Sequence, residues 1–153
     1  MYRNRYHEQL DRVDRWLDRI KHPGEDRTEN EDFLWAFFQN CWHLKDWIAD
    51  DPASGQSGDD MDKAIEGYDS LRVVQGLALS GKHLKVDSSK RPAKDPRVDK
   101  ALVLGRIHLG REESDWISYV AYDASANEWI PALELAEQAV KDWIEILTEK
   151  GLL

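Results

Sequence analysis

Two histidines and a carboxylate in this chain are of the residue types that acid–base chemistry uses. His43 and Asp46 lie three residues apart in the stretch FFQNCWHLKDWI. On a helix they would be neighbours, and the carboxylate could orient the imidazole. His83 follows Lys82 in the stretch SGKHLK. The sequence therefore predicts His43, Asp46 and His83 as candidate catalytic residues.

Each candidate also has a structural interpretation. His43 stands among large apolar residues, so the His43–Asp46 pair can equally be a polar contact at the edge of the core. Lys82 and His83 follow a predicted helix, and positive charge at a helix carboxyl end is favoured by the macrodipole. Cys41 falls on the apolar stripe of the same helix as His43, and we expect a core thiol there.

A basic segment covers residues 82–100. It holds seven Lys or Arg and three Asp, so its net charge is +4, against −13 for the rest of the chain. Phosphate contacts from it would make a nucleic-acid-binding segment. No aromatic residue lies between its charges, which favours a solvated, irregular loop as the alternative. The candidate nucleic-acid-binding residues are Lys82, Lys85, Lys90, Arg91 and Lys94.

A metal or small-ligand site near His7 is a further alternative. If the first three helices run up, down and up, a rise of about 1.5 Å per residue places His7 level with His43, and His83 at the opposite end. His7, His43 and Asp46 could then meet, although no third strong ligand is evident. The sequence has no P-loop, no dinucleotide glycine fingerprint and no G-x-S-x-G elbow, so we expect no cofactor.

Apolar periodicity predicts four helices, over residues 2–21, 28–49, 60–81 and 131–151. Thr28 and Glu31 have the spacing of a capping box at the start of the second helix, and Gly81 is a candidate cap at the end of the third. The second helix carries tryptophan and phenylalanine on several faces. We therefore expect it to be central, surrounded by its three companions, with His43 held by packing.

A β-hairpin is predicted over residues 101–123. The stretches ALVLGRIHL and WISYVAYD are rich in β-branched and aromatic residues, and GREES lies between them. The predicted fold is mainly α, a single domain over 1–153 that forms a four-helix bundle with a β-hairpin inserted before the last helix. An isolated hairpin is marginal in water, so this one needs cover from the helices or from a second copy.

Composition excludes several classes of protein. A net charge of −9 argues against binding of nucleic acid by the whole surface. A single cysteine excludes an internal disulfide and fits a reducing compartment. We see no apolar run that suits a signal peptide or a membrane span. We expect a cytoplasmic protein.

Two stretches, NCWHLKDWI and ALSGKHLKV, resemble a group of uncharacterised bacterial proteins. In that group an N-x-x-H-L-x-D-W helix is followed by a helix ending in a small residue and Lys-His. The likeness extends over residues 30–150 and implies no established activity. It departs at Leu79 and Gly81, where an asparagine is expected. The matching positions are Asn40, His43, Leu44, Asp46, Trp47, Ser80, Lys82 and His83.

More distantly, the chain resembles HEPN-type helical bundles, many of which are ribonucleases or toxins. Their catalytic pattern is an arginine, often followed by asparagine, with a histidine a few residues later. Here Gln39 stands where the arginine would precede Asn40, and His43 follows sooner than the pattern has it. The stretch RNRYH at residues 3–7 has the residue types at a spacing one shorter.

The preferred functional hypothesis is an intracellular helical bundle that acts through protein contacts rather than catalysis, as a homodimer or with another protein. Seven tryptophans and a hairpin that needs cover support it. Trp116 and Trp129 flank the hairpin and are candidate anchors, because tryptophan is enriched at interface hot spots. The alternative is a HEPN-like ribonuclease or toxin, of a toxin–antitoxin or phage-defence system, that uses His43 or His83 with the basic loop.

Overall fold

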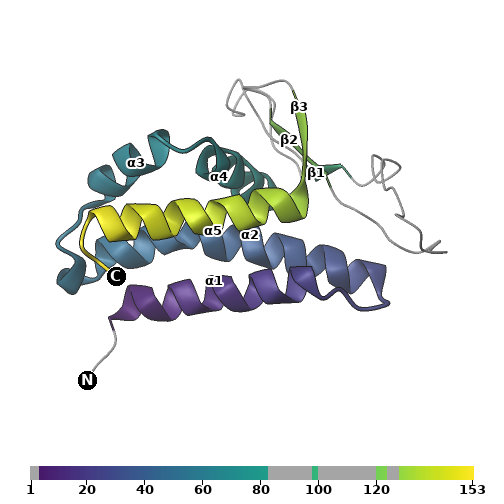
Figure 1. The fold of residues 1–153 in the computed structure, drawn as a ribbon, viewed down its shortest axis with the longest axis horizontal. Coiled ribbons are helices and arrows are strands. Elements are labelled where there is room, and N and C mark those ends of the chain that lie inside the picture. The colour runs from purple at the N-terminus through teal and green to yellow at the C-terminus, as the bar shows by residue number, and fades with distance from the viewer. Residues whose placement is uncertain (1–3, 83–97, 100–119, 124–127) are drawn as a thin grey trace.

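The computed structural model describes residues 4–82, 98–99, 120–123 and 128–153 of the chain (Figure 1). These residues are mainly helical, as the sequence predicts. The helical elements are α1 (Arg5–Lys21), α2 (Arg27–Asp50), the short 3₁₀ turn η1 (Pro52–Ser54), α3 (Gly58–Glu66), α4 (Asp69–Lys82) and α5 (Ala132–Glu149).

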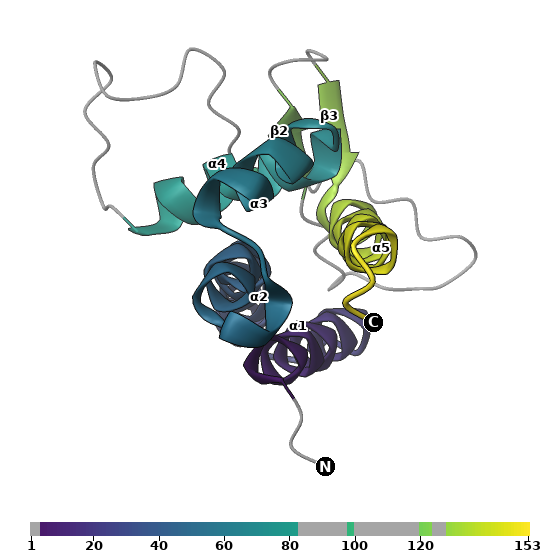
Figure 2. The ribbon, with the colours of Figure 1, turned by 90° about the vertical axis from the view of Figure 1, so that its left-hand side faces the viewer.

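The long helices surround one hydrophobic core. Viewed nearly along their axes, α1, α2 and α5 occupy three sides, and α3 with α4 occupies the fourth (Figure 2). All five α-helices contribute buried apolar side chains to this core. Trp143 of α5, only 1% exposed, is the largest of the fully buried side chains. Its indole N–H donates to the carbonyl oxygen of Cys41 in α2, at 3.1 Å.

Helix α2 contacts each of the other four α-helices, as expected of a central element. It is not enclosed by them, however, because one of its faces is open to water. Its core-facing residues are at most 4% exposed and include Leu44 and Ile48. Its opposite face exposes polar residues such as Asp32 and His43. Apolar residues occur on several sides of α2 because three tryptophans lie at the margins of the core, where they are only partly buried. These are Trp35, Trp42 and Trp47.

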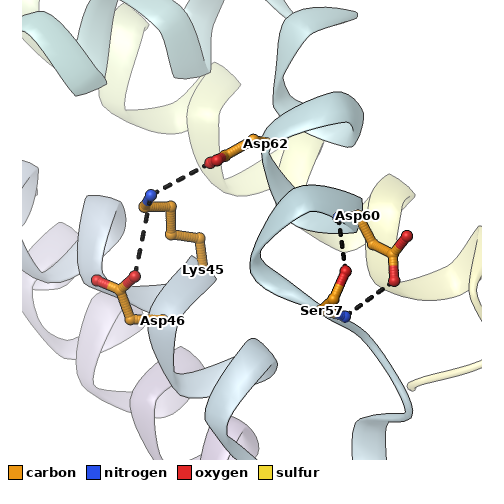
Figure 3. Close-up of polar contacts among 5 residues, drawn as sticks. All are labelled: Lys45, Asp46, Ser57, Asp60 and Asp62. Carbon is orange, nitrogen blue, oxygen red and sulfur yellow. Dashed lines mark hydrogen bonds and ion pairs between the residues drawn. The ribbon is translucent and has the colours of Figure 1, made fainter.

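The helix caps differ from the predicted ones. Asp26 caps α2, because its side chain accepts from the N–H groups of Thr28 and Glu29 at 2.9 and 3.2 Å. The capping box lies instead at α3, where Ser57 Oγ accepts from the Asp60 N–H and Asp60 Oδ2 accepts from the Ser57 N–H (Figure 3). The bond from the Ser57 backbone lowers the pKa of Asp60.

The predicted helix over 60–81 is two helices. Helix α3 ends before Gly67, whose N–H bonds back to the carbonyl of Ala64 at 3.4 Å. Helix α4 then continues through Gly81 to Lys82, so Gly81 is not a terminal cap. Apolar residues recur on both sides of the break at helical spacing, and periodicity alone therefore cannot locate it.

Three short strands precede α5. They are β1 (Val98–Asp99), β2 (Val120–Asp123) and β3 (Glu128–Pro131), paired antiparallel in the order β1–β2–β3. Strand β2 is the end of the second predicted strand. Strand β3, with Tyr122 opposite Trp129, was not predicted. The first strand of the predicted hairpin, over 101–109, lies outside the described residues.

Both ends of α5 are close to the predicted ones. The helix begins directly after Pro131 and ends before Gly151, whose positive φ of 68° suits a residue without a Cβ. The Leu152 N–H bonds to the carbonyl of Leu147 at 2.8 Å, which completes a Schellman cap. None of the helices in the described part of the chain has the length and apolar character that a bilayer span requires.

We predict that Leu44→Ala lowers the free energy of unfolding by about 2–5 kcal/mol, because it removes a side chain that is 0% exposed and leaves a cavity between α2 and its neighbours. Urea denaturation measures this loss. Ile144→Ala is the control: that side chain is 42% exposed, and its truncation should cost less than about 1 kcal/mol. Equal losses for the two variants would contradict this assignment of the core.

Candidate functional site

His43 points away from the core, and Asp46 does not hold it. The histidine is exposed, and no hydrogen bond joins it to any residue that the structure describes. The Asp46 carboxylate lies 3.9 Å from Lys45 Nζ, which also pairs with Asp62 Oδ1 of α3 at 3.2 Å (Figure 3). The predicted orientation of His43 by Asp46, and its packing among apolar residues, are therefore wrong. Whether either residue takes part in catalysis stays a prediction.

The other predicted site residues are not tested. Helix α4 reaches Lys82, but the side chains of the basic segment lie outside the described part of the chain. The same holds for the predicted anchors Trp116 and Trp129. The residues that stay predictions for catalysis or nucleic-acid binding are Lys82, His83, Lys85, Lys90, Arg91 and Lys94.

His7 is engaged at the carboxyl end of the chain. Its Nε2 lies 2.8 Å from the carbonyl oxygen of Leu152, and its ring packs against Tyr6 with centroids 4.4 Å apart. The Tyr6 hydroxyl donates to the same carbonyl at 3.1 Å. Within the described residues, no group of three or more His, Cys, Asp or Glu side chains could hold a metal ion. The alternative of a metal site at His7, His43 and Asp46 is therefore wrong, and that of a small-ligand site there stays a prediction.

Cys41 is a core thiol, as predicted. Its side chain is fully buried, and desolvation raises the pKa of the thiol to about 12. A nucleophilic or metal-binding cysteine needs the thiolate form at neutral pH. The surroundings of Cys41 favour the opposite, neutral form.

A buried polar cluster joins α4 to α5. The Ser70 hydroxyl donates to Asp142 Oδ2, and Gln138 Nε2 donates to Asp142 Oδ1 at 2.9 Å. Ser70 and Asp142 are each 8% exposed, so these bonds satisfy a carboxylate that has lost most of its water. The cluster is a structural contact that positions the start of α4 on α5.

A set of polar and aromatic contacts lies along the edge where α1 meets α2. Buried Gln9 donates from Nε2 to the backbone carbonyl and the side-chain oxygen of Asn40, at 2.9 and 3.2 Å. Asn40 donates in turn to the Ala36 carbonyl at 2.8 Å. Arg12 Nη1 donates to Gln9 Oε1. One amide relay therefore fixes a guanidinium near the protein surface.

Aromatic rings hold the arginines of the same edge. The guanidinium carbons of Arg5 and Arg12 lie 5.7 and 5.3 Å from the Trp47 ring centroid, and that of Arg19 lies 5.8 Å from the Phe33 centroid. These distances are typical of cation–π contacts. We call this edge the α1–α2 seam; it comprises Arg5, Gln9, Arg12, Trp16, Arg19, Phe33, Asn40 and Trp47.

Sequence reasoning missed the seam, although its pattern is present in the sequence. Arg5, Arg12 and Arg19 recur every seven residues, and so do Phe33, Asn40 and Trp47 on α2. Side chains seven apart lie on one face of a helix. The pattern is visible only when the polar residues of both helices are compared, whereas apolar periodicity draws attention to the core face.

Helix α2 presents a second surface on its other margin. Trp35 and Trp42, seven residues apart, are partly buried. Lys45 Nζ lies 4.4 Å from the Trp42 ring centroid, between the carboxylates of Asp46 and Asp62. We call this surface the α2 tryptophan face; it comprises Trp35, Trp42, Lys45, Asp46 and Asp62.

Comparison of the chain with models of protein families, with curated proteins and with solved structures found no match. The resemblances to a bacterial group and to HEPN-type bundles therefore stay predictions, and functional proposals depend on the chain's own geometry.

We predict that Cys41 in the folded protein resists alkylation by iodoacetamide, because a thiol with a pKa of about 12 is only about 0.01% thiolate at pH 8. The thiol of the unfolded chain has the usual pKa of 9.0, so it ionises at a lower pH than the thiol of the folded protein. The free energy of unfolding should therefore fall as the pH rises from 9 towards 12, and should fall less in Cys41→Ala. Rapid labelling without denaturant would show that Cys41 is accessible.

Proposed function

We propose that the protein acts through protein contacts rather than catalysis, and that the partner is a second copy of the chain bound at the α2 tryptophan face. The single observation that carries this proposal is the partial exposure of Trp35 and Trp42 on one face of α2. Partly exposed tryptophan presents large apolar area that a partner can cover, and tryptophan is the residue most enriched at hot spots.

The charges of this face support a second copy as the partner. Lys45 lies between Asp46 and Asp62, with 20% of its side chain exposed, while the two carboxylates are more than half exposed. A two-fold interface brings the same patch together from both copies, so the patch must be complementary to itself. A surface that contains one ammonium and two carboxylates around an apolar centre meets this requirement, because each lysine can pair with a carboxylate of the other copy.

We infer a four-helix bundle in which α3 and α4 together form the third helix, interrupted at Gly67, with the β-strands inserted before α5. In such a bundle the outer margins of α2 are the surfaces available for assembly, because its core face is already covered.

We predict a homodimer that weakens when both tryptophans are changed. Sedimentation equilibrium of the full chain should give a dimer, and Trp35→Ser with Trp42→Ser should raise the dissociation constant at least about tenfold, because two anchor side chains are lost. The control pair is Leu133→Ser with Ile144→Ser, exposed apolar residues of α5. A monomer at about 100 μM, or equal effects of the two pairs, would contradict the proposal.

A ribonuclease of the HEPN type is the second candidate function, because His43 is exposed. An imidazole open to water beside the seam is available for proton transfer, whereas a buried one is not. Asn40 lies one turn before His43, and through Gln9 it is linked to the Arg12 guanidinium. Arginine, asparagine and histidine, the residue types of the HEPN pattern, therefore lie near one another on α1 and α2.

We predict that, if this candidate is correct, expression of the intact protein degrades cellular RNA and slows growth, and His43→Ala abolishes both effects. The matched control is His22→Ala, an exposed histidine that follows α1. Growth curves and RNA integrity measure the outcome. An intact protein that leaves RNA whole would remove the ribonuclease candidate and leave the dimer proposal untouched.

A further inference from the structure

Three arginines of helix α1 lie in one row along the helix. Arg5, Arg12 and Arg19 repeat every seven residues, so all three lie on the side of α1 that borders the seam. Asp11, Asp14 and Asp18 repeat at three and four residues on another side. Burial, and repulsion from Asp11, raise the pKa of Asp14, as expected where carboxylates gather. The seam is therefore a local basic ridge on an acidic protein.

The arginines of this ridge are held at regular steps. Seven residues of helix advance about 10.5 Å, so Arg5 and Arg19 are about 21 Å apart along the axis. Arg12 is fixed by its hydrogen bond to buried Gln9, and rings of α2 lie against all three guanidinium groups. Side chains already held in place lose little conformational entropy on binding.

Aromatic rings alternate with these charges along the seam. Trp47 lies by Arg5 and Arg12, and Phe33 lies by Arg19 and packs against Trp16 with centroids 5.9 Å apart. Proteins that bind single strands combine a positive track for the backbone with planar groups on which bases stack, and guanidinium planes serve as such groups as well. The basic segment over 82–100 has the charges but no aromatic residue between them.

We infer that the α1–α2 seam is a binding site for single-stranded nucleic acid, in which Arg5, Arg12 and Arg19 contact phosphates and their guanidinium planes, backed by the rings of α2, offer surfaces on which bases stack. The length of the ridge fits a chain with repeating charges better than one isolated anion. Glu8 is an exposed carboxylate on the same side of α1, and the net charge of −9 weakens the attraction of the whole protein for a polyanion. Binding at the seam therefore has moderate affinity.

The inference is independent of the dimer proposal, because the seam and the α2 tryptophan face are on opposite margins of α2. It is also separable from cleavage by His43. His43→Ala leaves the arginines and Trp47 in place, so it should change binding by less than about twofold even if it abolishes RNA degradation.

Fluorescence anisotropy of a labelled, mixed-sequence single-stranded RNA of about twelve nucleotides tests the site, with salt varied from about 50 to 200 mM. For three phosphate contacts the logarithm of the binding constant should fall with a slope of about −2 against the logarithm of salt concentration. Arg5→Gln with Arg19→Gln should reduce this slope to about −0.7 and weaken binding at low salt at least about tenfold. Both side chains are exposed, and Arg12 keeps its bond to Gln9.

The matched control is Lys63→Gln with Lys141→Gln, which removes the same charge from exposed positions on α3 and α5. It should change affinity by less than about twofold. If the arginine pair does not fold by circular dichroism, Arg19→Gln alone, a single change at an exposed arginine of the seam, should weaken binding at least about threefold. Three results would each overturn the inference: no binding at low salt, equal losses in both pairs, or equally effective competition by polyglutamate.

Discussion

The packing of Trp143 of α5 against α2 is the contact on which the rest of the structure depends. Its ring is almost fully buried, and its indole N–H is satisfied by the carbonyl of Cys41. A buried tryptophan needs both a shaped pocket and an acceptor, so this contact fixes the rotation of α5 and α2 about their axes. The Cys41 thiol lies in the same core, and its burial raises the pKa enough to keep it neutral, although the Trp143 side chain acts in the opposite direction.

The rotation of α2 determines what its two margins can do. With Leu44 and the other core residues turned inward, one margin meets α1 at Asn40 and Trp47, and the other carries Trp35 and Trp42. The first margin is polar and basic because α1 brings its arginines there. The second is apolar with mixed charges. One helix therefore serves two proposed contacts, and neither disturbs the core.

Sequence patterns predicted the helical class, most helix ends and the core thiol, because these depend on local periodicity and hydrophobicity. They failed for His43. Its apolar neighbours in sequence lie on other faces of α2: Leu44 is fully buried, and Trp42 is partly buried. Adjacent residues on a helix point about 100° apart, so the residues next to a given position in the sequence say little about its environment in the fold. The break at Gly67 was missed for a related reason, since an uninterrupted apolar period continues across it.

By itself, the sequence determined that this chain buries one face of each long helix, because apolar side chains repeat at the helical period and their removal from water is favourable. It also determined the seven-residue spacing of the arginines on α1. Only the tertiary structure decided which rings and amides those arginines meet, and which side of α2 faces water. These features depend on how α1, α2 and α5 are rotated against one another, and that rotation is set by contacts between residues far apart in the chain, such as Gln9 with Asn40 and Trp143 with Cys41.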